Sequence, residues 1–228
     1  MKRKTGFSTE LAYVLGIVTL AFGTGLMERS DFGMSMVVAP AYVLHLIISQ
    51  TYPFFTFGTA EYCFQAALLI VMCLVLQQFK GSYLFYFVTA VFYWFTLDAC
   101  MALVALIPGD GLMFRLLFYM LGLIVCAMGV SMLFHTYIAP EVYELFVKEI
   151  AAKTGKNINV CKTIYDCASC AIGILMSFAF FGLWHLEGVK LGTIFCALVN
   201  GATIGLCSRV LDANFEFRDA LSLRKYFQ

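Results

Sequence analysis

The stretch MKRKTGFSTELAYVLGIVTLAFGTGLM, residues 1–27, places a basic cluster directly before an apolar run. Lys2, Arg3 and Lys4 form the cluster, and the run extends from Leu11 to Met27. Basic residues that flank a membrane helix favour the cytoplasmic side. Because no convincing small-residue cleavage site follows, the run is predicted to stay in place as a first transmembrane helix and not to be removed as a signal peptide.

The composition places the whole chain in the membrane. Of its 228 residues, 62% are hydrophobic and 13% are charged, and the mean hydropathy is +0.87. These values exceed what a soluble domain of this length needs to fill one core. About 20 apolar residues cross a bilayer, and six stretches approach that length: Leu11–Met27, Tyr62–Leu76, Tyr83–Ile107, Leu112–Phe134, Cys167–Trp184 and Leu191–Val210.

The distribution of basic residues decides the number of crossings, since the segment Met34–Gln50 is apolar enough to be a seventh helix. With six spans and both termini cytoplasmic, 12 of the 15 Lys and Arg residues lie inside and only Arg29, Arg115 and Lys190 lie outside. A seventh crossing reverses this bias or exports the amino-terminal cluster. Met34–Gln50 is therefore predicted to lie in the interface or to enter and return, with Ala39-Pro40 breaking any continuous helix.

Six spans divide into two halves of three, and an odd number of spans inverts the second half relative to the first. We expect an all-α integral membrane protein with one domain over 1–228, repeats at about 8–107 and 112–211, and a cytoplasmic tail at 212–228. Each half has a long connection after its first helix. The matching features are Gly23–Gly25 with Gly129, Tyr62 with Tyr165, and Lys80-Gly81 with Glu187-Gly188.

The long connection of the second half contains an amphipathic helix, predicted over Pro140–Lys156. Its apolar stripe consists of Val142, Leu145, Phe146 and Ile150. The spacing predicts ion pairs of Glu144 with Lys148 and of Glu149 with Lys153. The Gly in Thr154-Gly155-Lys156 is a stop signal, and the helix is expected on the cytoplasmic surface.

Motifs along nearly the whole chain carry a family resemblance. They are Gly23–Gly33, the run Ile138-Ala139-Pro140-Glu141-Val142-Tyr143-Glu144, the Lys162–Asp166 pair, and Gly188-Val189-Lys190-Leu191-Gly192-Thr193 leading to Asn200-Gly201. With these residues the chain resembles the bacterial YczE/YitT-like membrane proteins, in the branch catalogued as a domain of unknown function. The resemblance implies a multi-pass protein of the bacterial cell (inner) membrane, without settled chemistry.

Two positions depart from the pattern of that family. Met36 stands where a Pro is expected, and Phe85-Tyr86 replaces the Gly-Thr found at Gly192-Thr193. Any site formed by the two halves is therefore expected to be asymmetric.

Asp98 is the first candidate for a functional side chain, because it lies inside the third apolar stretch with no basic residue nearby. A carboxylate in the bilayer core costs at least about 2.5–3.5 kcal/mol on insertion scales, so it usually faces a cavity or a partner. The alternative is that Asp98 lies near the helix end and contacts interfacial water.

Further candidates for a substrate or ion pathway are Glu61, Asn200, Lys162, Asp166 and Glu141. Lys162 and Asp166 are four residues apart and can pair on one helix face. The alternative for Glu61 and this pair is helix capping and interface anchoring. Asn200 is either a cavity group or an interhelical hydrogen-bonding group.

Five glycines are predicted to allow close helix packing: Gly23, Gly25, Gly129, Gly201 and Gly205. The last two have the small-xxx-small spacing that brings membrane helices together.

Several function classes lack support. The net charge of +1 offers no basic stripe for nucleic acid. Most of the nine cysteines lie in or near apolar stretches, and Cys167 and Cys170 lack the second ligand pair that a structural zinc site needs. No Ser/His/Asp set and no phosphate-binding Gly loop occurs, so no enzyme, cofactor or metal site is predicted.

The leading hypothesis is a small-molecule transporter or permease-like protein, with binding near the midplane and Asp98 as a proton-coupling or cation-binding group. A second hypothesis is a substrate-binding membrane subunit of a larger importer. A third is a non-transporting helper that organises membrane enzymes or senses lipids. Partners are then the lipid bilayer, an unknown small molecule or ion, and either importer subunits or a second copy in a homodimer.

Overall fold

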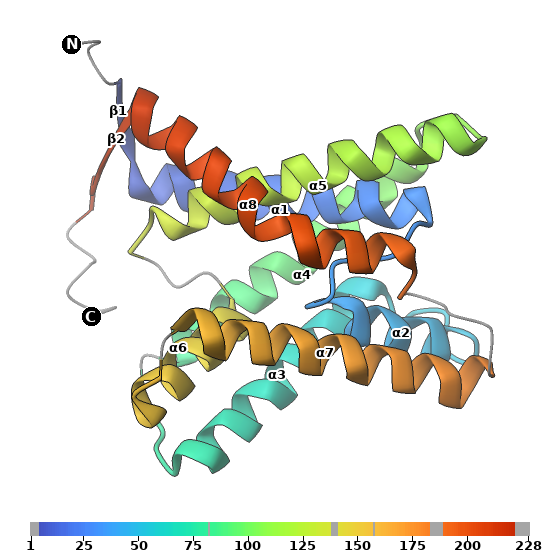
Figure 1. The fold of residues 1–228 in the computed structure, drawn as a ribbon, viewed down its shortest axis with the longest axis horizontal. Coiled ribbons are helices and arrows are strands. Elements are labelled where there is room, and N and C mark those ends of the chain that lie inside the picture. Colours follow the sequence, from blue (N-terminus) through green and yellow to red (C-terminus); the bar gives the residue numbers. More distant parts are fainter. Residues whose placement is uncertain (1–4, 82, 138–140, 157, 183–188, 222–228) are drawn as a thin grey trace.

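The order of the elements is long helix, short helix, long helix, long helix, and it occurs twice (Figure 1). The computed structural model describes residues 5–81, 83–137, 141–156, 158–182 and 189–221. Its elements are β1 (Thr5–Ser8), α1 (Thr9–Ser30), α2 (Ala39–Ser49), α3 (Phe57–Leu76), α4 (Tyr83–Ala105), α5 (Leu112–Phe134), α6 (Val142–Thr154), α7 (Ile158–Phe181), α8 (Leu191–Asn214) and β2 (Phe215–Arg218).

Six helices in the described ranges are long and apolar enough to cross a membrane, namely α1, α3, α4, α5, α7 and α8. This confirms a multi-pass helical protein, and the predicted bounds of α5 agree with the structure. The seventh helix begins at Ile158 and not at Cys167, because its first turns carry Lys162 and Asp166 and hydropathy alone does not detect them. The predicted end of that span, Trp184, lies outside the described residues.

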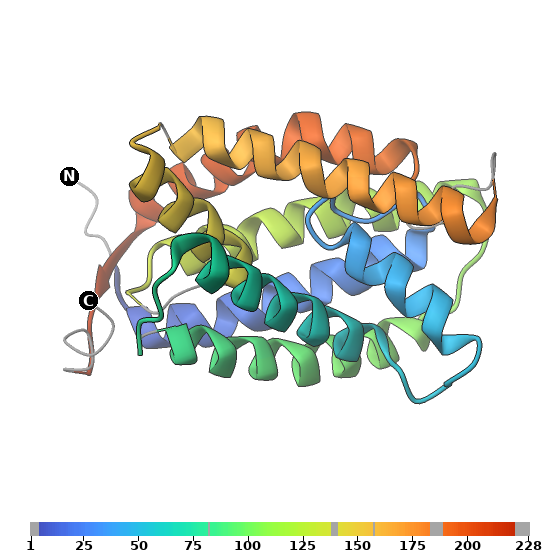
Figure 2. The same cartoon turned by 90° about the horizontal axis from the view of Figure 1, so that it is seen from below.

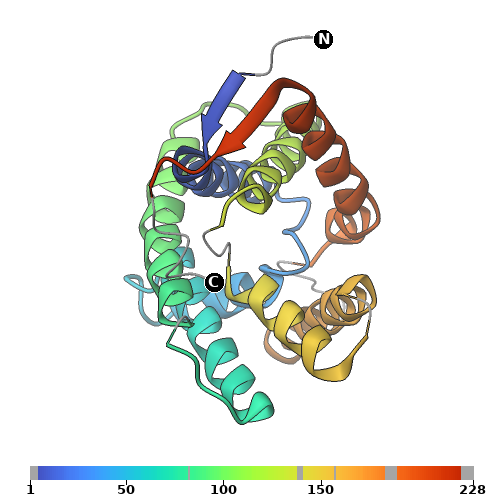
Figure 3. The ribbon, with the colours of Figure 1, turned by 90° about the vertical axis from the view of Figure 1, so that its left-hand side faces the viewer.

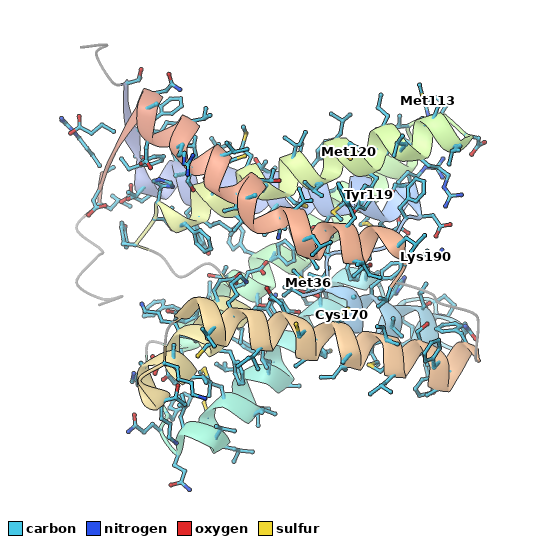
Figure 4. The ribbon with its side chains drawn as sticks, in the orientation of Figure 1. Met36, Met113, Tyr119, Met120, Cys170 and Lys190 are labelled. Carbon is cyan, nitrogen blue, oxygen red and sulfur yellow. The ribbon has the colours of Figure 1, made fainter. Side chains whose placement is uncertain are left out.

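The apolar segment after α1 forms only the short helix α2, which has Pro40 in its first turn, where no intrahelical donor is required. The preceding segment, 31–38, runs into the interior. Met34 and Met36 are buried there, and Figure 4 shows Met36 between the upper and lower helices of that view. Met34–Gln50 therefore does not form one continuous helix.

The contact between α1 and α5 depends on glycines. A Cβ added to Gly23 would lie 2.6 Å from the Cys126 backbone nitrogen, and one added to Gly129 would lie 2.6 Å from the Leu20 nitrogen. Gly16 and Gly122 are similarly close to the facing helix. A Cβ on Gly25, in contrast, would have an ordinary contact distance of 3.5 Å to Val104.

The packing predicted for Gly201 and Gly205 is not found within one chain. An added Cβ at either residue would meet no atom within 4 Å, and both residues are exposed. The physical reason is that α8 buries mainly Gly192, Thr193, Cys196 and Leu211, so the face with the small residues is turned outward.

The helices form two groups by contact. In the first group α1 packs on α4 and α5, and α5 packs on α8. In the second group α2 packs on α3 and α7, and α6 packs on the same two helices. Helices α3 and α4 join the groups along one side (Figure 2), whereas no comparable contact joins α7 to α8 in the described ranges (Figure 3).

Helix α6 confirms the predicted apolar stripe, since Val142, Leu145, Phe146 and Ile150 all pack in one cluster with residues of α3 and α4. Gly155 ends the helix with a φ of 64°. The predicted start at Pro140 lies outside the described residues.

The predicted ion pairs along α6 are wrong. Glu149 pairs with Lys80 at 3.0 Å, and Glu144 faces Lys162 at 3.7 Å. Lys153 instead donates a hydrogen bond to the Val75 carbonyl oxygen. Because α6 packs between other elements, its charged groups meet partners across helices and not along one exposed face.

The two ends of the chain are joined by a parallel pair of strands, in which Thr5 lies beside Phe215 and Ser8 beside Arg218. The Glu10 carboxylate accepts hydrogen bonds from the backbone of Ala220 and Leu221 and from the Tyr137 hydroxyl. Residues 5–10 and 215–221 therefore lie at the same end of the molecule, which agrees with an even number of crossings between them.

Candidate functional site: a cavity between the two helix groups

A cavity of about 70 Å³ lies between the two helix groups. This space is large enough for a few water molecules or a small ion, and its volume is well below that of a site for a drug-sized ligand. Elements of both groups line it, together with the segment before α2. The polar or charged side chains in the lining are Thr24, Ser35, Tyr93, Glu141, Glu144, Lys162 and Asn200.

Glu141 is the most unusual of these side chains. It directly precedes α6 and is only 8% exposed. Its carboxylate does not cap the helix that it precedes, and its Oε1 has no hydrogen-bond partner in the described part of the structure. Burial, followed by the nearby Glu144 and Glu61, raises the pKa of Glu141 well above its usual range, against the opposing effect of Lys162.

Glu144 and Lys162 stand beside Glu141 in the cavity wall. The Lys162 Nζ lies 3.7 Å from Glu144 Oε1 and 3.6 Å from Asp166 Oδ1, so the predicted pairing with Asp166 is present. Glu144 Oε2 is buried and has no hydrogen-bond partner among the residues that the structure describes. One ammonium thus faces several carboxylates.

Glu61 lies behind this wall, on α3, and is fully buried. Its Oε1 accepts hydrogen bonds from the Tyr143 hydroxyl at 2.7 Å and from the Gln65 amide at 3.2 Å. Its Oε2 has no hydrogen-bond partner within the described ranges. The buried acidic groups of α3 and α6 therefore meet next to the cavity.

The opposite wall of the cavity is less charged. Asn200 on α8 and Ser35 line it, and the Thr24 hydroxyl lies 3.3 Å from the Tyr93 hydroxyl. Cys126 and Cys196 are buried thiols in the same lining.

A polar network lies at the end of the molecule remote from β1 and β2. Arg115 donates hydrogen bonds to the Ser30 and Asp31 carbonyl oxygens and pairs with the Asp31 carboxylate at 2.8 Å. Lys190 pairs with the same carboxylate. Tyr119 donates a hydrogen bond to the Gly192 carbonyl oxygen, and Figure 4 places Tyr119 and Lys190 at this end. These contacts hold α1, α5 and the start of α8 together.

Asp98 does not line the cavity. Its carboxylate accepts hydrogen bonds from the Thr56 hydroxyl at 2.6 Å, the Gly58 backbone N–H at 2.9 Å and the Trp94 indole N–H at 3.1 Å. Thr56 and Gly58 begin α3, where backbone N–H groups lack intrahelical acceptors. These hydrogen bonds are sufficient to explain why a carboxylate occurs inside an apolar helix, and no transport pathway is needed to explain it. A role of Asp98 in transport stays a prediction.

The structure thus brings together Glu141, Lys162 and Asn200 in one lining, with Glu61 and Asp166 beside it, and leaves Asp98 apart. Sequence reasoning missed the roles of Gln65, Tyr143 and Tyr93. A signal was present for Gln65, which follows Glu61 by four residues and so shares its helix face. Tyr143 gave no such signal, because its contact joins helices far apart in the sequence.

No curated protein and no solved structure matches the chain. A family model does match over residues 7–209, which is most of the chain. The family has no established function, and its description contains neither a ligand nor an activity. The chain therefore belongs to the family of unknown function DUF6198.

Proposed function

We propose that this protein is a transporter for a small molecule or ion, and that it works by alternating access around the cavity between its two helix groups. The observation that carries this proposal is Glu141, a buried residue in the lining of that cavity, whose Oε1 has no hydrogen-bond partner in the described part of the structure. Buried ionisable groups between membrane helices are expensive and typically line substrate or proton pathways.

An inverted repeat is the architecture that supports alternating access. The contact of α1 with α4 corresponds to that of α5 with α8, and the contact of α2 with α7 corresponds to that of α6 with α3. Gly16 and Gly23 correspond to Gly122 and Gly129 at one constant spacing of 106 residues. A two-fold axis between α1 and α5 would relate all of these features, with binding at the interface of the repeats.

One difference between the halves suggests the motion. Helix α3 packs on α4, but the corresponding helices α7 and α8 make no comparable contact in the described ranges. In an inverted repeat, exchanging the conformations of the halves generates the second access state. We therefore expect a state in which α7 closes on α8 while α3 separates from α4.

The orientation proposed from the charge bias places both termini and α6 in the cytoplasm of a bacterial cell. In the described state the network of Asp31, Arg115 and Lys190 then closes the outer side. The resemblance of the sequence to the YczE/YitT-like proteins is consistent with this topology.

Accessibility of the cavity from each side tests the proposal without knowledge of the substrate. Asn200→Cys, in a background without other cysteines, is reconstituted into vesicles of known orientation and treated with a charged, membrane-impermeant thiol reagent. A transporter exposes this position to each side in turn, so we expect modification from both sides. Leu198→Cys is the control, because Leu198 lies on the same helix but is 79% exposed on the outer surface of the chain, where lipid shields the thiol.

Modification of Asn200→Cys from one side only would contradict alternating access. That result would favour a binding subunit, whose cavity opens to a single compartment. Modification from neither side would favour a helper protein without a transport pathway.

A further inference from the structure

We infer that the cavity binds a small organic cation bearing N–H donors, of the size and shape of guanidinium, and that this cation exchanges with a proton on Glu141. The inference rests on the proposed function, since it names the class of cargo for the same cavity. It depends on the buried acceptor atoms in the lining that have no donor within the described ranges, on the charge of the lining and on the volume of the cavity.

The lining contains buried carboxylate oxygens that lack hydrogen-bond donors in the part of the chain that the structure describes. Glu141 Oε1 and Glu144 Oε2 are both buried without a hydrogen-bond partner among the described residues, and both residues line the cavity. An ionised carboxylate only accepts hydrogen bonds, and a buried acceptor without a donor costs about 1–3 kcal/mol or more. A ligand that donates two or more hydrogen bonds would satisfy both oxygens.

The charge of the lining selects a cation. Lys162 is the basic side chain in the lining, and its ammonium is already flanked by Glu144 and Asp166. Neither Glu141 nor the neighbouring Glu61 forms an ion pair in the described ranges, and Lys162 acts on Glu141 only from a greater distance. An anion would meet this excess of carboxylates and is disfavoured.

The arrangement of the acidic groups favours a hydrogen-bonding cation over a bare metal ion. No three His, Cys, Asp or Glu side chains converge as a metal site requires, within the part of the chain that was searched. Divalent ions need more oxygen ligands than this lining brings to one point. A planar cation with several N–H groups can instead bridge two separate carboxylates, and the space of about 70 Å³ limits it to a few heavy atoms.

The exchange with a proton follows from the surroundings of Glu141. The titratable groups that act on it are Glu61 from α3, Tyr93 from α4, Cys126 from α5, Glu144 from α6 and Lys162 from α7. The two glutamates and burial favour the neutral carboxylic acid in the empty cavity. When the cation binds, the proton leaves Glu141 for solvent and the carboxylate takes the cation in its place, so the charge of the site is conserved.

Binding to the purified full-length chain in detergent tests this assignment. Isothermal titration with guanidinium, at millimolar concentrations, is compared with titration of urea, which has the same shape without the charge. We expect saturable binding of guanidinium and none of urea. Repeating the titration in buffers of different ionisation enthalpy should show release of one proton per cation, and the affinity should fall as the pH is lowered.

Glu141→Gln keeps the shape of the side chain and removes its charge. We expect it to weaken guanidinium binding at least about tenfold, the usual effect of losing a charged hydrogen bond, and to abolish proton release. Glu149→Gln is the matched control on the same helix, because Glu149 pairs with Lys80 away from the cavity, and it should bind as the wild type does.

Equal affinity of Glu141→Gln and wild type would overturn the role of Glu141. Absence of guanidinium binding to the wild type, while Asn200→Cys is modified from both sides, would overturn the class of cargo and leave the proposed transport function standing. Binding of urea as tight as that of guanidinium would also overturn the cation assignment.

Discussion

Tyr143 on α6 donates a hydrogen bond of 2.7 Å to the carboxylate of Glu61 on α3, and both side chains are at most 1% exposed. This contact joins the third helix of the first half of the chain to the short helix of the second half. It also supplies one of two donors to a carboxylate that would otherwise be buried with little compensation.

Tyr143→Phe should therefore destabilise the protein. Among the described residues, removing the hydroxyl leaves Glu61 with only the Gln65 amide as donor, and losing a hydrogen bond to a buried group costs about 1–3 kcal/mol. Thermal unfolding in detergent should show a lower Tm than for Tyr52→Phe, because Tyr52 is 53% exposed. Equal Tm values for the two variants would contradict the structural role of this hydrogen bond.

The two glycines near the end of α1 should respond differently to alanine. Gly23→Ala would place its Cβ 2.6 Å from the Cys126 nitrogen, so α1 and α5 must separate, and overpacking of this kind costs about 1–3 kcal/mol. Gly25→Ala meets only ordinary contacts and gains about 0.5–1 kcal/mol from helix propensity. Thermal unfolding of both variants measures the difference, and a Gly23→Ala protein as stable as Gly25→Ala would show that the helices are not in close contact.

Asp98 should prove to be a stabilising residue. Asp98→Ala removes the two hydrogen bonds to the start of α3 and the one from Trp94 on α4, and it should cost about 1–3 kcal/mol. Asp98→Asn retains one acceptor oxygen and should cost less. Guanidinium affinity should be unchanged in the folded fraction of Asp98→Asn. A normal Tm combined with lost binding would instead support the pathway role predicted from the sequence.

The stability of the protein should depend on pH through Glu141. Because burial and neighbouring carboxylates raise its pKa in the folded state, the folded protein binds a proton more tightly than the unfolded chain does. The stabilisation that Glu141 contributes is fully present below the pKa that it has in the unfolded chain. It is lost as the pH rises through the pKa that Glu141 has in the folded protein. Between those two pH values the loss is about 1.4 kcal/mol per pH unit.

Glu141→Gln removes this titration, since Gln stays neutral. The Tm of wild type relative to Glu141→Gln should therefore fall as the pH is raised. A constant difference across the pH range would contradict a protonated Glu141 in the folded protein.

Labelling of single cysteines should establish the orientation. Lys156→Cys follows the end of α6 and is expected to react with an impermeant maleimide only from the cytoplasm. Tyr52→Cys, in the connection between α2 and α3, should react only from outside. Reaction of Lys156→Cys only from outside would refute six crossings with α2 as a non-spanning helix.

Much of the fold could be predicted from local signals. The lengths of the apolar stretches predicted the six long helices, and Ala39-Pro40 predicted the break before α2. Both features depend only on residues that are neighbours in the sequence. The stripe of α6 followed from helical periodicity. The start of α7 was missed because Lys162 and Asp166 interrupt its hydropathy although their backbone is helical.

The candidate site was less predictable. Asp98 is a predicted pathway residue because it is a carboxylate in an apolar helix. Its partners Thr56 and Gly58 lie at the start of another helix, so the sequence around Asp98 does not indicate them. The ion pairs of Glu144 and Glu149 were assigned along α6 and are formed across to α7 and to Lys80. Side-chain pairing within a helix is a weak preference, and tertiary contacts override it.

The sequence by itself determined that this chain is a helical membrane protein with six long apolar helices, because hydropathy and helix length are properties of consecutive residues. Only the tertiary structure decided that Glu141, Glu144, Lys162 and Asn200 share one cavity and that Asp98 holds the start of α3. These relationships join residues far apart along the chain, so they arise only when the helices pack and buried polar groups find, or fail to find, their partners.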